Sequence, residues 1–204
     1  MKKPCFVAQI QFSILALGLL VAAAGCIPSL NPLYTDKELI YDPALVGVWS
    51  EQPDSKDTWT FAQGEAKSYN VRITEGDKHS LLVGHLVQLG DQKFLDLTPH
   101  KDGLEDSKRE GVFLASLIPG HLAIWVKSIQ PVLTLSVMDL DWFGEYLKKN
   151  PKAIPHQFLD DRLIFTGSTR ELQQFVLKTI TEPKAWSEGS KFNRTEKSAQ
   201  KQGR

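Results

Sequence analysis

The sequence has few of the residues that form cross-links or the usual catalytic centres. It holds 2 cysteines in 204 residues, Cys5 and Cys26, both near the start of the chain. No disulfide is therefore predicted in the remainder, which must be held together by its core alone. The sequence contains no Gly-x-Ser-x-Gly motif and no Gly-rich phosphate loop. These absences disfavour a disulfide framework, a serine hydrolase of the common type and a nucleotide-binding enzyme.

The chain also lacks a net charge and a long apolar run. Its 24 Lys and Arg balance 24 Asp and Glu, which gives no indication of nucleic-acid binding. The uninterrupted apolar run, residues 14–25, has 12 residues, whereas a spanning helix needs about 20. Lys2 and Lys3 precede the apolar region and small residues close it, the pattern of a secretory signal peptide over residues 1–25. The alternative is an uncleaved anchor helix, which the short run disfavours.

From residue 46 onward, apolar residues alternate with polar ones in short segments, as in half-buried strands. Tyr69, Val71 and Ile73, for example, would share one face of a strand. Pro119 and Gly120 fit a tight turn. After that turn, Leu122, Ile124 and Val126 would pair with Leu133, Leu135 and Val137. The predicted strands cover residues 46–50, 58–62, 69–74, 80–89, 93–97, 112–118, 121–128 and 132–138.

Helical spacing appears after residue 138. Asp139 or Asp141 would cap a helix whose apolar face includes Trp142 and Phe143 and which ends at residues 150–151. The two aspartates could also be paired carboxylates, but their place before the helix favours capping. Residues 162–167 form a ninth predicted strand. A capping box, Ser168 with Glu171, begins a second amphipathic helix that should dock on the sheet.

Eight consecutive strands with short connections predict a mainly β fold, an antiparallel up-and-down barrel followed by a helix–strand–helix segment. The predicted domain covers residues 44–181. Residues 26–43 would be a tether with one helical turn at 36–40. Residues 182–204 are polar and basic, which predicts a disordered tail. A barrel of this size is filled by side chains or holds one small ligand. The aromatic residues that would fill it or line a cavity are Trp49, Trp59, Phe61, Phe94 and Trp125.

Histidines and carboxylates give no metal signature. The 5 histidines form no H-x-x-x-H pair and no H-E-x-x-H motif, so neither a metal nor a cofactor is predicted. His85 and Asp96 lie on neighbouring predicted strands and could share the barrel interior. They are the one candidate pair for a hydrolase, but such pairs are often structural. No catalytic residue is therefore assigned, and the protein is predicted not to be an enzyme.

The residues "AAGC" that end at Cys26 resemble the lipobox of bacterial lipoproteins. This resemblance implies that Cys26 receives a diacylglycerol and that the peptide is then cut before it, so that a lipid holds the mature chain at the membrane. Ala23 stands where leucine is usual. Ile27, where an aspartate would imply retention at the inner membrane, implies the outer membrane, with the protein on its periplasmic side.

Two further resemblances concern the barrel. Gly47-Val48-Trp49 is similar to the Gly-X-Trp of lipocalins, in which the tryptophan plugs the closed end of an eight-stranded barrel. Across nearly all of residues 26–180, the chain also resembles a family of uncharacterised bacterial lipoproteins. This second resemblance implies the cellular location and the barrel fold, and it implies no activity. It is carried by the segments "CIPSLNPLY", "LVGVWS", "DTWTF", "FLDL", "IPGH" and "STRELQQFVLK".

Together, the patterns predict a membrane-anchored lipoprotein of the bacterial cell envelope. The leading hypothesis is a module that binds a small apolar ligand or lipid, and a pocket of about 300 Å³ or more would favour it. The alternative is a structural or protein-interaction subunit with a solid barrel. The predicted pocket walls are Tyr69, Val71 and Ile73 on one side and Leu122, Ile124 and Val126 on the other.

Overall fold

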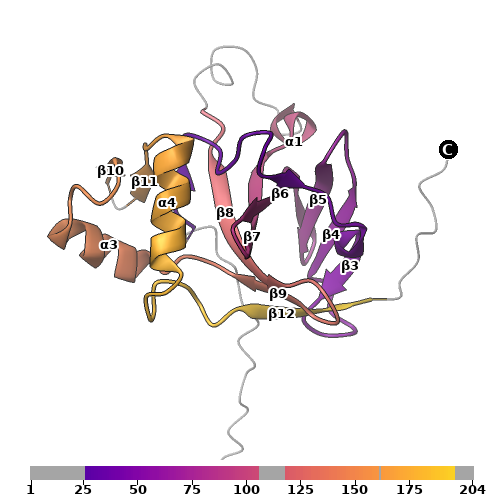
Figure 1. Cartoon of the computed structure of the whole chain (residues 1–204). Coiled ribbons are helices and arrows are strands. Elements are labelled where there is room, and N and C mark those ends of the chain that lie inside the picture. Colours follow the sequence, from indigo (N-terminus) through magenta and orange to yellow (C-terminus); the bar gives the residue numbers. More distant parts are fainter. Residues whose placement is uncertain (1–25, 106–117, 161, 196–204) are drawn as a thin grey trace, which may run out of the picture.

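The computed structural model describes residues 26–105, 118–160 and 162–195. Its main feature is a closed antiparallel barrel of eight strands (Figure 1). The strands lie side by side in chain order, and β8 pairs with β9, β9 with β12, and β12 with β3 to close the ring. The predicted up-and-down, lipocalin-like barrel is therefore confirmed. The eight strands are β3 (Gly47–Ser50), β4 (Thr58–Gln63), β5 (Ser68–Glu75), β6 (Lys78–Leu89), β7 (Gln92–Pro99), β8 (His121–Ser128), β9 (Leu133–Ser136) and β12 (Ser190–Arg194).

The longest strands are joined by two-residue turns. Gly76 begins the turn between β5 and β6, and Gly90 begins the turn between β6 and β7, with φ of 59° and 58°. Glycine adopts such positive φ values without the steric cost that other residues meet, and each is followed by aspartate, a favoured partner in tight hairpins. These turns set the register of β5, β6 and β7.

The strand that completes the barrel comes from the segment predicted to be a disordered tail. β12 pairs with both β3 and β9, and Trp186 and Phe192 are buried. The prediction of disorder is therefore wrong for residues 183–195. Because Trp186 and Phe192 are separated by polar residues, they form no periodic pattern, and the polar composition of the segment wrongly indicates disorder. The predicted strand at residues 112–118 lies outside the described residues, except for Ile118, which is in no strand.

The predicted tether is also part of the fold. β1 (Pro28–Ser29) pairs with β8 and β11 (Arg162–Phe165), and β2 (Leu39–Ile40) pairs with β6. Asp42 then caps the short 3-10 helix η1 (Pro43–Leu45). Ile27 and Leu33 are buried. In place of the helical turn predicted at residues 36–40 there is a turn that leads into β2. Residues 26–43 contain three prolines, which interrupt the spacing of the apolar residues but do not prevent this segment from packing against the barrel.

Two helices and a short sheet extension lie on one side of the barrel (Figure 1). α3 (Leu140–Lys149) is capped by Asp139, and α4 (Thr169–Thr179) begins with the predicted capping box, so both predicted helix starts are confirmed. The predicted ninth strand is β11, and it pairs with β10 (His156–Leu159), which was not predicted. A further short helix, α1 (Lys101–Glu105), follows β7. No helix in the described ranges is long and apolar enough to cross a membrane.

The alternation of side chains divides the apolar residues into two cores. The inner core fills the barrel, and the outer core lies between the barrel wall, the N-terminal segment, α3 and α4. The predicted face-to-face pairs on β8 and β9 are correct only for Val126 with Leu135. Leu122 has no partner on β9, because β1 pairs with β8 at His121 and Leu122. On its other edge, β8 pairs with β7, with Ile124 opposite Leu95 and Leu122 opposite Leu97.

Candidate functional site

The six residues predicted to line a ligand pocket all belong to the inner core. Tyr69, Val71, Ile124 and Val126 are buried, whereas Ile73 and Leu122 are half-buried. The structure therefore brings the two predicted walls together inside one barrel.

The deep part of that interior is occupied by protein side chains. If the interior held a void large enough for water, the side chains around that void would have solvent-accessible surface. Six large inner-core side chains have none, with an exposed fraction of 0%. Their contacts are therefore with protein on all sides, as in a close-packed core. These six are Leu45, Trp49, Tyr69, Leu86, Leu95 and Leu133.

Trp49 is completely enclosed by protein. The Trp49 indole Nε1 donates a hydrogen bond to the Leu45 carbonyl oxygen at 2.8 Å. The guanidinium carbon of Arg194 lies 4.5 Å from the centre of the Trp49 ring, a cation–π arrangement, and the guanidinium also donates to the carbonyl oxygens of Ala44 and Val46. These contacts enclose the Trp49 indole, and the role of Gly47 and Trp49 as a barrel plug stays a prediction.

Gly47 is needed for a steric reason. Its φ is +145°, a value that favours glycine, and a side chain at this position would collide with the Arg194 guanidinium. Arg194 was not predicted, because it lies in the segment predicted to be disordered and no local pattern links it to Trp49.

Three inner-face aliphatic residues, Ile73, Leu82 and Leu122, are less enclosed, because they are only half-buried and pack against the edge of the inner core. They lie close to the β5–β6 turn, the end of β7 and the start of β8. These three residues form what we call the barrel mouth.

The predicted His85–Asp96 pair lies outside the barrel. The two residues are directly opposite each other on β6 and β7, but their neighbours Leu86, Leu95 and Leu97 point into the inner core. Because consecutive side chains of a strand point to opposite faces, His85 and Asp96 face outward, and the expectation that they share the interior is wrong.

Asp96 is a buried acceptor beneath the N-terminal segment. Its carboxylate is 1% exposed and accepts hydrogen bonds from the Leu33 backbone N–H at 2.8 Å and from His121 Nδ1 at 2.7 Å. His85 Nδ1 instead hydrogen-bonds to the Tyr34 hydroxyl at 3.1 Å, and the two rings lie 4.7 Å apart. Asp96 therefore fastens the N-terminal segment to the barrel wall.

Burial dominates the electrostatics of this polar cluster. It lowers the pKa of His85, an effect that Asp96 opposes and His121 reinforces. Burial also raises the pKa of Tyr34, with smaller contributions of the same sign from Asp96 and Asp36. Within the described residues, no serine, threonine or cysteine side chain hydrogen-bonds to either histidine of the cluster, so the geometry supplies no nucleophile for a histidine base.

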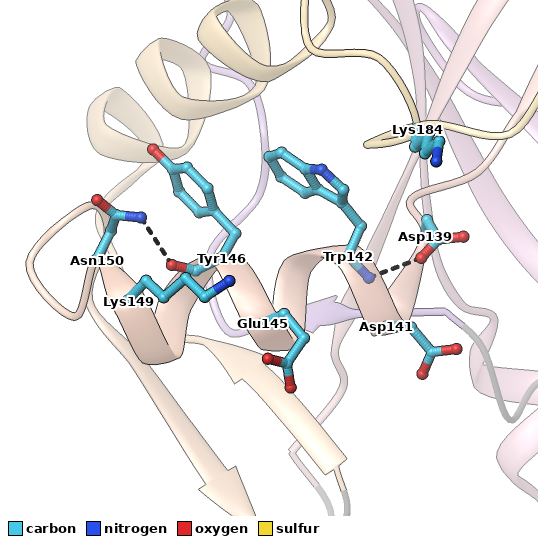
Figure 2. Close-up of a pocket in the computed structure, with 8 residues that line it drawn as sticks. All are labelled: Asp139, Asp141, Trp142, Glu145, Tyr146, Lys149, Asn150 and Lys184. Carbon is cyan, nitrogen blue, oxygen red and sulfur yellow. Dashed lines mark hydrogen bonds between the residues drawn. The ribbon is translucent and has the colours of Figure 1, made fainter.

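A surface groove of about 490 Å³ follows α3 (Figure 2). Trp142 and Tyr146 rise from the helix in the same direction, with ring centroids 4.8 Å apart and an angle of 11° between their planes. Asp139 is used as the cap, since its carboxylate accepts from the Trp142 backbone N–H at 2.7 Å. The aromatic residues of α3 were predicted to lie on the apolar face of the helix, and no groove was predicted. The other residues that line it are Asp141, Glu145, Lys149, Asn150 and Lys184.

The groove is a weak candidate for catalysis or metal binding. Glu145 is paired with Lys148 at 2.8 Å, and Asp139 is held by the helix backbone. In the described part of the chain, no group of three or more histidine, cysteine, aspartate or glutamate side chains is arranged to hold a metal ion.

Comparison with protein-family models, with characterised proteins and with solved structures finds no match for this chain. The assignment of the fold therefore rests on the strand order and register described above.

Proposed function

We propose that this protein is a lipid-anchored, non-enzymatic component of the bacterial cell envelope, whose barrel is a solid scaffold and which works through its outer surface. The packed interior carries the proposal. Six large side chains with no exposed surface occupy the space that a buried ligand would need. The scaffold would face the periplasm from the outer membrane, and its partner would contact the outside of the barrel or the helices.

The anchor rests on the sequence around Cys26 and on its surroundings. Cys26 is partly buried, and burial raises the pKa of its thiol. A thiol with a raised pKa is a weak nucleophile, which disfavours a catalytic role for this cysteine. Acylation of Cys26, as implied by the resemblance to a lipobox, would hold the protein at a membrane, because each buried methylene contributes about 0.8 kcal/mol.

The anchor is tested by Cys26→Ser in a bacterium that processes lipoproteins. We expect the variant to lose acylation and to remain unprocessed or to leave the membrane fraction. The measurement is the intact mass of the purified protein together with its fractionation. An unmodified Cys26 in the native chain would overturn the anchor.

A second candidate function is the binding of a small apolar ligand at the barrel mouth. The half-buried Ile73, Leu82 and Leu122 favour it, because they present aliphatic surface at one end of an otherwise filled barrel. A ligand there would cover the mouth and would not displace the deep core.

Two substitutions on the same face of β8 separate these functions. Ile124→Phe overpacks the deep core and should cost about 1–3 kcal/mol of unfolding free energy. Leu122→Phe at the mouth should cost less, because its side chain has room to move. With a solid scaffold, neither the native protein nor the variants bind an apolar fluorescent probe. Probe binding that is weakened by Leu122→Phe, with stability retained, would support the second function and overturn the first.

A further inference from the structure

The groove along α3 is framed by two chain segments that are fixed to each other. The Asp139 N–H donates a hydrogen bond to the Ala185 carbonyl oxygen at 2.9 Å, and Met138 forms a β-bridge with Trp186. These contacts join the start of α3 to the segment that carries Lys184. The sides of the groove are therefore held in place, and its volume of about 490 Å³ lies within the range of about 300–1,000 Å³ that is usual for ligand sites.

The centre of the groove is aromatic. Trp142 and Tyr146 are half-buried, and both line the groove (Figure 2). In the described part of the chain, the hydrogen bonds of these two residues use only their backbone atoms, whereas every buried side-chain nitrogen or oxygen there has a partner. The Trp142 indole N–H and the Tyr146 hydroxyl are therefore open to solvent. The groove presents apolar ring surface beside polar groups that are free to bond to a ligand.

The rim of the groove carries both signs of charge. Asp141 and Glu145 supply carboxylates, and Lys149 and Lys184 supply ammonium groups, all on exposed residues. Glu145 is already paired with Lys148. Neither an anion nor a cation would meet charges of one sign here. A hydroxyl group both donates and accepts, so it can bond to either kind of side chain, and the rim suits a neutral ligand rich in hydroxyl groups.

Lys184 is held at the groove by an uncommon backbone conformation. Its φ is +71°, a left-handed value that residues with a Cβ rarely adopt. The next residue, Ala185, is fully buried, so the surrounding structure fixes the turn. Glycine would adopt this conformation at less cost, and strain of this kind gathers at ligand sites. The choice of lysine is consistent with a use for its ammonium group.

We propose that the α3 groove binds a neutral saccharide chain. The C–H groups of the sugar pack on the open parts of Trp142 and Tyr146, and its hydroxyl groups bond to Asp141, Lys149 and Lys184. Polarised C–H groups are attracted to the negative face of an aromatic ring, so a sugar matches an aromatic centre with a charged rim. This inference rests on the proposed function, which assigns the work of the protein to its outer surface, and it names the chemistry of the partner.

Binding is measured by isothermal titration calorimetry on the purified full-length protein, in a detergent without a sugar headgroup. The probes are chitotetraose and cellotetraose, neutral tetrasaccharides that distinguish amino-sugar chains from hexose chains. We expect at least one of them to bind, and Trp142→Ala to weaken that binding about tenfold or more, as truncation of a central tryptophan does at other interfaces. Trp125→Ala, at a half-buried tryptophan outside the groove, is the matched control and should leave the affinity unchanged.

Lys184→Gly is a second variant that keeps the fold, because glycine accepts the positive φ at this position. It should weaken saccharide binding about threefold or more, through loss of a charged hydrogen bond, with an undiminished urea midpoint. If neither tetrasaccharide binds at millimolar concentration, this inference is overturned and the solid scaffold stands, because the apolar probe tests that separately. Binding that neither groove variant weakens would also overturn it. Binding of inorganic phosphate or tetramethylammonium instead, weakened by the same variants, would contradict a saccharide and make the groove an ion site.

Discussion

The inner and outer cores are built from the same strands but by different rules. The inner core takes one face of consecutive strands and closes with a single distant contribution, Phe192 of β12. The outer core takes the other face of β6 and β7 and must be covered by segments from both ends of the chain, which include Ile27, Leu33 and Trp186. One core is local in sequence, and the other is assembled from remote pieces.

The two cores also differ in polarity. In the inner core, the Tyr69 hydroxyl accepts from the Asp42 N–H at 2.8 Å and donates to the Asp42 carbonyl oxygen at 3.1 Å, and the Trp49 indole donates to the Leu45 carbonyl oxygen. The wall of the outer core holds the carboxylate of Asp96, buried and satisfied by a backbone donor and a histidine. Every buried side-chain nitrogen or oxygen in the described part of the chain has a hydrogen-bond partner. A filled inner core therefore supplies rigidity, and the polar contact on the outside sets where the N-terminal segment lies.

The largest effect is expected from removing the strand that closes the barrel. Deletion of residues 190–204 removes β12, leaves β3 and β9 with unpaired edges and takes Phe192 from the inner core. Loss of a buried phenylalanine alone costs about 3–5 kcal/mol, a large part of the stability of about 5–15 kcal/mol that is usual for a domain. We expect no cooperative urea transition. Deletion of residues 196–204 is the control, and equal midpoints for the two truncations would contradict the closure by β12.

The second largest effect is expected from truncating Trp49. Trp49→Ala removes a fully buried indole, its hydrogen bond to Leu45 and its contact with Arg194. We expect a loss of about 3–5 kcal/mol in the free energy of unfolding, measured by urea denaturation. Trp142→Ala, in the half-buried groove of α3, should cost less. A loss below about 0.5 kcal/mol for Trp49→Ala lies in the range of ordinary surface substitutions and would contradict the prediction that Trp49 plugs the barrel.

A smaller and more local effect is expected from the outer polar cluster. Asp96→Ala leaves the Leu33 N–H without its acceptor, and an unsatisfied buried donor costs about 1–3 kcal/mol. We expect faster hydrogen exchange at the Leu33 amide, while amides of the barrel strands keep their protection. Asp102→Ala, at an exposed residue of α1, serves as the control. Unchanged exchange at Leu33 would show that Asp96 does not fasten the N-terminal segment.

The smallest effect is expected from the titration of His85. Burial lowers its pKa in the folded protein from the value of 6.5 that is usual for histidine. The unfolded chain therefore binds the proton first as the pH falls, so stability decreases from about pH 6.5 down to the lower pKa of the folded state and is unaffected above pH 6.5. His85→Gln should flatten this part of the stability curve, measured as the urea midpoint from pH 7.5 to pH 5. A curve that is unchanged by the substitution would place the pH dependence elsewhere.

Local patterns in the sequence predicted much of the inner structure. Alternation placed Tyr69, Val71 and Ile73 on one face, and that face points into the barrel. The helix caps could also be predicted from the sequence, because the side chains of Asp139 and Ser168 each accept from a backbone N–H only three residues away. Each of these features depends on neighbours within one turn or one strand.

The sequence by itself determined the alternating strands and the two helix starts. Only the tertiary structure decided that the N-terminal segment and residues 190–194 are strands, that Asp96 faces outward to Leu33 and His121, and that Arg194 covers Trp49. The physical reason is distance along the chain. Arg194 hydrogen-bonds to backbone oxygens 148 and 150 residues away, and such contacts form only after the barrel brings the two ends of the domain together, so no local spacing records them.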